Sequence, residues 1–151
     1  MTSSLLKGGV VQQSVFESVR YSAACQGCGA EAEWQGVQAL VGDSLRWDVG
    51  STCSACGFAV AVCGRDLPDE LRGRLLSEHR PAALQVPLPV QKTKVMRVLR
   101  AELSIGLADV KVVLERVLAG AYAGTLPEIE RLARRLRAAG VDAMAVRPAC
   151  V

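Results

Sequence analysis

The chain has 151 residues, half of them hydrophobic, and a net charge of +3. This length suits one globular domain or two very small ones. No apolar run approaches the ~20 residues that span a bilayer, and residues 1–9 lack the basic start and apolar run of a secretion signal. We therefore expect a cytoplasmic protein, in a compartment where thiols stay reduced.

Charge is divided unevenly along the chain. Residues 1–83 carry 7 basic and 9 acidic side chains, a net charge of −2, whereas residues 84–151 carry 11 and 6, a net charge of +5. A basic second half indicates an acidic partner, either nucleic acid or an acidic protein surface, unless it is an ordinary solvated helical face. Arg outnumbers Lys 14 to 4 and Ala is abundant, which suggests a high-GC bacterial genome.

Residues 1–13 are polar, and we expect them to be flexible. Four strands are predicted after them, because loosely alternating hydrophobic side chains are separated by turn signals such as Gly42-Asp43. The expected strand ranges are 15–23, 33–41, 44–49 and 58–63.

Two C-x-x-C-G motifs lie among these strands and contribute Cys25, Cys28, Cys53 and Cys56. Two residues between cysteines let both sulfurs of one turn reach one ion, and the following glycine can adopt a positive φ. Four protein ligands leave no open coordination position, so we expect one structural Zn²⁺ per chain in a zinc ribbon. Disulfides and unconnected buried thiols are the alternatives, and a reducing compartment argues against disulfides.

The remaining reactive side chains are few. We expect Cys63 to be a small buried core residue, Cys150 to be a free thiol in a loose tail, and the single histidine, His79, to be the polar end of a helix. The chain has no nucleophile motif, no phosphate-binding loop and no conspicuous carboxylate pair, so we expect no catalysis.

A helix is predicted to follow the ribbon, from the candidate N-cap Asp66 to about His79. This helix completes a first unit of residues 14–80. Residues 81–90 hold three prolines and form a joint. Within the joint, residues 84–88 are a candidate first strand of the next domain, which its prolines would restrict to a sheet edge.

Residues 84–149 show helical periodicity, with three sets of apolar residues that each share a face. The sets are Val95, Val98, Leu99 and Leu103; Leu107, Val110, Leu114 and Val117; and Ile129, Leu132, Ala133 and Leu136. Thr125 and Glu128 form a capping box, in which each side chain reaches the other residue's amide. Gly140 is a natural helix stop, a short strand is possible near residues 121–124, and residues 142–146 return as a strand.

Three segments of this half match a known pattern. Residues 94–100 (KVMRVLR) match a helix of the type K-V-x-x-I-K-x-V-R, residues 105–115 (IGLADVKVVLE) match G-L-G-L-K-E-A-K-x-L-V-E, and residues 132–146 match A-x-x-L-K-x-x-L-E-E-A-G-A-x-V-x-V. Residues 84–147 therefore resemble the C-terminal domain of the bacterial ribosomal stalk protein, the large-subunit seven/twelve family.

The resemblance implies a three-stranded antiparallel sheet covered by three helices, a fold shared with a protease adaptor of the Clp system. It also implies protein binding rather than catalysis. In the stalk family the first two helices recruit translational GTPases through a basic and apolar surface, and the matching positions here are Val95, Met96, Arg97, Arg100 and Lys111. The stalk family's dimerisation helices and hinge are replaced here by the cysteine motifs and the Pro-rich joint, so ribosomal membership is not implied.

The sequence therefore predicts an α+β protein, a zinc ribbon followed by a stalk-like domain, that acts as a non-catalytic adaptor for a protein partner. One alternative is an immunity or antitoxin protein that neutralises a toxin, which an adjacent toxin gene would support. The other is a nucleic-acid- or ribosome-associated ribbon protein that uses the arginines crowded on one helix, although no aromatic platform accompanies them. Those arginines are Arg131, Arg134, Arg135 and Arg137.

Overall fold

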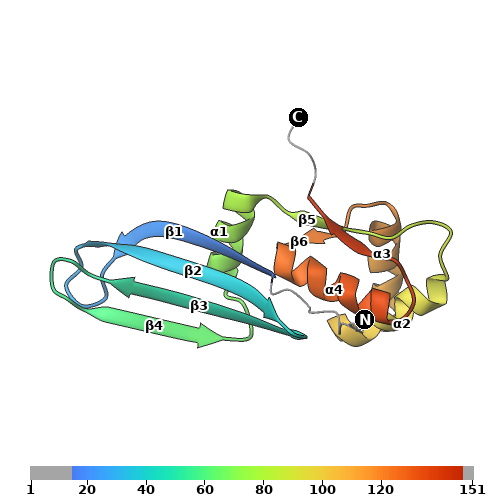
Figure 1. Ribbon diagram of the computed structural model, residues 1–151, viewed down its shortest axis with the longest axis horizontal. Coiled ribbons are helices and arrows are strands. Elements are labelled where there is room, and N and C mark those ends of the chain that lie inside the picture. Colours follow the sequence, from blue (N-terminus) through green and yellow to red (C-terminus); the bar gives the residue numbers. More distant parts are fainter. Residues whose placement is uncertain (1–14, 148–151) are drawn as a thin grey trace, which may run out of the picture.

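The chain forms two antiparallel sheets and four helices in a computed structural model that describes residues 15–147. The first part contains β1 (Val15–Ala24), β2 (Glu31–Val41), β3 (Ser44–Thr52), β4 (Ala59–Gly64) and α1 (Asp69–His79). The second contains β5 (Ala82–Gln85), α2 (Lys92–Leu103), α3 (Leu107–Leu118), β6 (Ala123–Gly124), α4 (Leu126–Ala138) and β7 (Met144–Val146). The strand orders are β1-β2-β3-β4 and β6-β5-β7 (Figure 1).

One face of the four-stranded sheet is buried, as the alternation of its residues predicts. In β2 the even-numbered side chains, among them Trp34 and Leu40, are buried and their odd-numbered neighbours are more exposed. Helix α1 covers part of this face, where its Leu71 and Leu75 pack with Val19 of β1. The Leu71 side chain occupies the space that a Cβ at position 36 would need, which explains a glycine in the middle of β2.

The second part of the chain has a larger aliphatic core of its own. Its buried members come from all three helices and from β5, and the largest are fully enclosed. Helix α4 contacts the strands of both sheets, so it lies between them and joins the two parts of the molecule (Figure 1). The expected three-stranded antiparallel sheet with three helices is therefore present. The four strands expected for the ribbon form the four-stranded sheet, which packs against α4.

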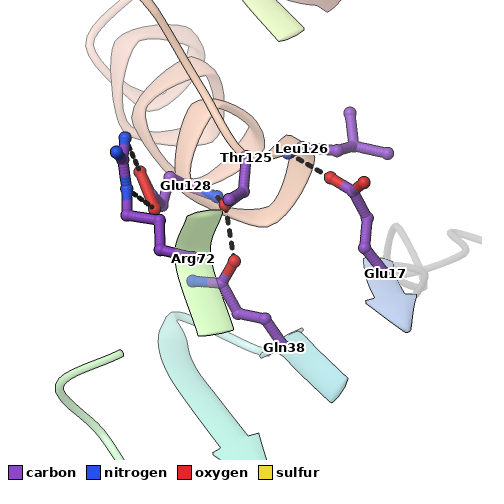
Figure 2. A network of polar contacts seen from close by, with 6 residues as sticks. All are labelled: Glu17, Gln38, Arg72, Thr125, Leu126 and Glu128. Atoms are coloured by element: carbon purple, nitrogen blue, oxygen red, sulfur yellow. Dashed lines mark hydrogen bonds and ion pairs between the residues drawn. The ribbon is translucent and has the colours of Figure 1, made fainter. Parts of the chain in front are cut away.

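A polar junction connects the two parts at the N-terminus of α4 (Figure 2). Glu17 of β1, only 3% exposed, accepts a hydrogen bond from the Leu126 amide at 2.6 Å. The Thr125 hydroxyl donates to the side-chain carbonyl of Gln38 on β2 and accepts from the Glu128 amide. Because the sheet satisfies groups at the helix start, the junction fixes the position of α4 against β1 and β2.

Two helix-start expectations need correction. Helix α1 begins at Asp69 with Pro68 as its N-cap and no side-chain cap, so Asp66 does not cap it. At α4, Thr125 caps Glu128 as predicted, but the Glu128 carboxylate does not reach back. It is held instead by the guanidinium of Arg72 on α1, through bonds of 2.9 and 3.2 Å. The guanidinium donates two charge-assisted hydrogen bonds to the carboxylate, which is a stronger interaction than one bond from a backbone amide.

Two strand expectations are also corrected. The predicted edge strand at residues 84–88 is instead the central strand β5, which ends at Gln85 before the prolines and so keeps its amides available for pairing. Cys63 was expected in the core but is exposed, because it lies opposite Asp48 on the outward face of β4. Cys150 and residues 1–13 lie outside the described residues.

The polar junction allows a stability test. We expect Thr125→Val to lower the free energy of unfolding by about 2 kcal/mol, because it removes the cap of α4 and leaves the buried Gln38 side chain without its partner. Denaturant titration measures the change. The matched control is Thr52→Val at an exposed position of β3, which should change stability by less than about 0.5 kcal/mol. Equal losses in both variants would contradict the assigned role of the junction.

Candidate functional site

Both C-x-x-C-G motifs fold into the same turn, at the end of the four-stranded sheet away from α4. The Cys25 amide donates to the Ala30 carbonyl at 2.7 Å, and the Cys53 amide donates to the Phe58 carbonyl at 2.8 Å, five residues on in both cases. Gly29 and Gly57 follow the motifs with φ of 77° and 76°. The expected positive φ is therefore confirmed at both glycines, where a residue with a Cβ would be strained.

The two turns bring the four cysteine sulfurs into one cluster. Cys25 Sγ lies 3.7 Å from Cys56 Sγ, and Cys28 Sγ lies 3.8 Å from Cys53 Sγ, so each close pair joins the two turns. All four sulfurs lie within 4.8 Å of one another, and none forms a disulfide. A tetrahedral ion with Zn–S bonds of about 2.3 Å has sulfur–sulfur edges of about 3.8 Å. The cluster therefore has the dimensions of a four-thiolate metal site.

Backbone amides face the sulfurs, as expected for thiolates. The Gly27 amide donates to Cys25 Sγ at 3.2 Å, and the Phe58 amide donates to Cys56 Sγ at 3.4 Å. The amides of Cys28 and Gly27 outweigh burial and lower the pKa of Cys25 to about 7. At Cys56 the Phe58 amide lowers the pKa, but burial and the neighbouring sulfurs outweigh it and raise that pKa to about 12. Four thiols this close cannot all ionise unless a cation neutralises them.

The first cysteine of each motif is buried and the second is exposed. Cys25 and Cys53 are 5% and 2% exposed, and they form a small cluster with Ala32. A Cβ on Gly27 would lie only 3.0 Å from Cγ of Phe58, so the Phe58 side chain packs closely against the first turn. Four sulfurs complete a tetrahedron around one ion, so the cluster is suited to a structural metal site.

A second candidate site is an open groove of about 530 Å³ between α2 and α3. Its lining is mainly apolar with two arginines, and consists of Thr93, Met96, Arg97, Arg100, Ala101, Ser104, Ile105, Leu107 and Val110. Leu107 was expected to share an apolar face with Val110, Leu114 and Val117, but it is 52% exposed because it lies at the first position of α3, beside the groove. Leu107 and the half-buried Ile105 were not identified from the sequence as residues that line a groove.

The residues predicted to form a partner surface separate into two groups. Met96, Arg97 and Arg100 line the groove, and Lys111 is exposed on α3 one turn after Leu107. Val95 does not belong to this surface, because it is 0% exposed and packs in the core with Leu99. A helix face that packs in the core cannot also contact a partner. The stalk-like sequence pattern does not distinguish the core face of α2, which carries Val95, from the groove face, which carries Met96 and Arg97.

The cations at the groove are not neutralised by neighbouring acids. No ion pair joins Arg97, Arg100 or Lys111 to an acidic side chain within residues 15–147. The acidic residue of α2, Glu102, instead binds Arg131 at 2.9 Å on α4, together with Arg135 at 3.4 Å. The groove therefore keeps its positive charge for an external group.

The arginines of α4 are engaged within the molecule. Arg137 and Arg134 both bind Glu130, at 2.6 and 3.2 Å. Arg131 and Arg134 also donate to backbone carbonyls of the β2–β3 turn, at Asp43 and Gly42. The nucleic-acid alternative depends on these arginines, and the position of α4 between the two sheets directs them toward acids and carbonyls of the same chain.

His79 ends α1 as expected, and is not close to the cysteines. Its Nε2 lies 2.7 Å from the Ser18 carbonyl, to which it donates, and its Nδ1 faces Glu17 at 3.8 Å.

Within residues 15–147, no helix has both the length and the apolar character needed to cross a bilayer. Comparison with protein-family profiles, with curated proteins and with solved structures finds no match.

Proposed function

We propose that the four cysteines hold one structural Zn²⁺ and that the chain is a non-catalytic adaptor that binds an acidic protein through the α2–α3 groove. For the metal, the support is the set of sulfur–sulfur distances, which match a tetrahedral four-thiolate site. Tetrahedral four-thiolate sites bind either zinc or iron. Zinc has no redox chemistry, which suits a purely structural role.

For the adaptor, the observation that carries the proposal is the combination of apolar and cationic side chains in one groove. Its exposed apolar side chain, Leu107, and the half-buried Met96 can receive an apolar anchor. Arg97 and Arg100 flank that surface and form no ion pair with an acidic residue in the described range 15–147, and the planar guanidinium can bind a carboxylate through two hydrogen bonds. An apolar centre with a charged rim is typical of protein-binding surfaces.

The resemblance of residues 84–147 to the ribosomal stalk domain supports the same surface, because the matching positions in that family recruit translational GTPases. The partner proposed here is a protein segment with acidic side chains around an apolar anchor.

The test compares capture of host proteins by the wild-type chain, by groove variants and by variants with an equal change of charge elsewhere. Loss confined to the groove variants supports the proposal.

Nucleic-acid binding is a second candidate, since the groove cations are exposed. Engagement of the α4 arginines within the molecule leaves few cations for phosphates. We expect weak binding to a random-sequence duplex, and three phosphate contacts would give a salt slope of about −3 in log K against log salt concentration. Fluorescence anisotropy across a salt series measures this. Sub-micromolar affinity at about 150 mM salt would instead favour a nucleic-acid function.

A further inference from the structure

The outer edge of the four-stranded sheet is unprotected. Strand β4 pairs with β3 alone in the part of the chain that the structure describes, so one side of its backbone is free (Figure 1). Its sequence, AVAVCG, contains no charge and no proline. Ala61 is exposed, and Val62 is 50% exposed. A row of free amides and carbonyls on an apolar strand is a template for pairing with another strand.

The other sheet edges in the molecule carry features that prevent such pairing. Strand β1 has the inward-pointing acid Glu17 and the exposed Arg20. The edges of the second sheet are very short, with two residues in β6 and three in β7. Short edge strands and charged edge residues are the usual means by which proteins avoid edge-to-edge contact. Among the described strands, β4 is therefore the edge on which these features are missing.

The residues of β4 are arranged symmetrically about Ala61. On the outward face Ala61 is flanked by the small residues Ala59 and Cys63, and on the inward face it is flanked by Val60 and Val62. An antiparallel copy centred on Ala61 would place each valine opposite a valine and each small residue opposite a small one. A two-fold contact requires this kind of self-complementary surface, whereas a foreign strand does not.

The same register suits the ends of the strand. Phe58, which is 41% exposed, would lie opposite Gly64 of the second copy. Gly64 has no side chain to obstruct a ring, and the Trp47 side chain packs directly against it. An aromatic contact would therefore extend the pairing beyond the valines.

We propose that β4 pairs antiparallel with β4 of a second copy of this chain, centred on Ala61, to give a continuous eight-stranded sheet. The contact joins the two copies along the β4 edge of the four-stranded sheet, the edge opposite β1. The groove between α2 and α3 stays free in both copies. The dimer is expected to be weak, because a pairing of six residues buries less surface than a standard interface.

Sedimentation of the zinc-loaded full chain, from about 5 to about 200 µM, tests the proposal, because small interfaces dissociate at low concentration. The wild-type chain should pass from monomer to dimer. Ala61→Lys should remain monomeric, since two lysines would face each other across the axis. The matched control, Ser22→Lys at an exposed position of β1, should associate like the wild type. A monomeric wild type, or dimers of Ala61→Lys, would overturn the proposal.

A cross-link tests the register independently. Directly opposed residues in an antiparallel pair have Cα atoms about 4.5–5.5 Å apart, within the range of a disulfide. Ala61→Cys combined with Cys63→Ser should therefore form a covalent dimer under mild oxidation, measured by non-reducing electrophoresis. Ser22→Cys in the same Cys63→Ser background should not. Equal cross-linking at both positions would show random collision and would contradict the proposed pairing.

Discussion

Replacing Cys53 with serine is expected to release the zinc and to unfold the four-stranded sheet, while residues 82–146 stay folded. Apparent zinc-binding free energies of four-ligand sites are about 10–16 kcal/mol, which is as large as the whole stability of a small domain. The buried apolar clusters around the sheet are small, and the one at the cysteines contains Ala32 as its principal non-sulfur member. Packing alone therefore cannot hold the two turns together.

The second part of the chain should survive because its core is self-contained. Every residue of its buried cluster lies between Ala82 and Ala143. Metal analysis by mass spectrometry should give about one zinc per wild-type chain and none in Cys53→Ser, because four thiolates complete one site. Hydrogen exchange should become fast in β1 to β4 and remain slow in α2, α3 and most of α4. The first turn of α4 should lose some protection, because Glu17 and Gln38 no longer satisfy it.

The control for this experiment is Cys63→Ser. Cys63 is an exposed cysteine outside the cluster, so its replacement should leave both the zinc content and the exchange pattern unchanged. Fresh, reduced wild-type protein that contains no zinc, or that contains iron instead, would contradict the assignment. So would a Cys53→Ser protein that retains a full equivalent of zinc.

The cysteine cluster was predictable from the sequence because its geometry is local. Two residues between cysteines and a following glycine specify each turn, and the strands between the motifs specify how the turns meet. The helices and strands were also predictable, since alternation and the helical period recur over segments long enough to be distinctive. Four sulfurs in one cluster are now established, whereas the identity of the ion remains a proposal.

The polar junction was not predictable in the same way, although a signal for it exists. Glu17 and Gln38 occupy inward positions of their strands, in register with each other. A charged or amide side chain at an inward position must find a partner, but only the fold shows that the partner is the start of α4, more than 80 residues away. The contacts of two α4 arginines were not predictable for the same reason, since Arg131 and Arg135 pair with Glu102 of α2.

Reversing two charges at the groove is expected to abolish partner capture without unfolding the chain. Arg97→Glu with Lys111→Glu replaces two exposed cations by anions, so an acidic partner meets repulsion at the position where it met attraction. We expect affinity to fall at least about a hundredfold, or about 2.7 kcal/mol. Each exposed substitution should change stability by less than about 0.5 kcal/mol. Capture of host proteins, followed by quantitative mass spectrometry, measures the loss.

Controls distinguish a specific groove from a general effect of charge. Arg134 and Arg137 are unsuitable, because both bind Glu130 and their reversal would disturb α4. Arg46→Glu with Arg65→Glu makes the same change in net charge at exposed positions of the first part of the chain. Equal loss of capture in the two charge variants would show that net charge alone attracts the partner, and the groove proposal would be wrong.

A third variant tests the apolar part of the groove. Leu107→Ser changes no charge and removes an exposed side chain at the edge of the groove, so it should leave the core of α3 intact. If the partner inserts an apolar anchor, this variant should weaken capture of the same protein that the charge reversal loses. If capture persists in Leu107→Ser and fails only after charge reversal, the interaction is electrostatic, and the arginines act without the apolar surface between α2 and α3.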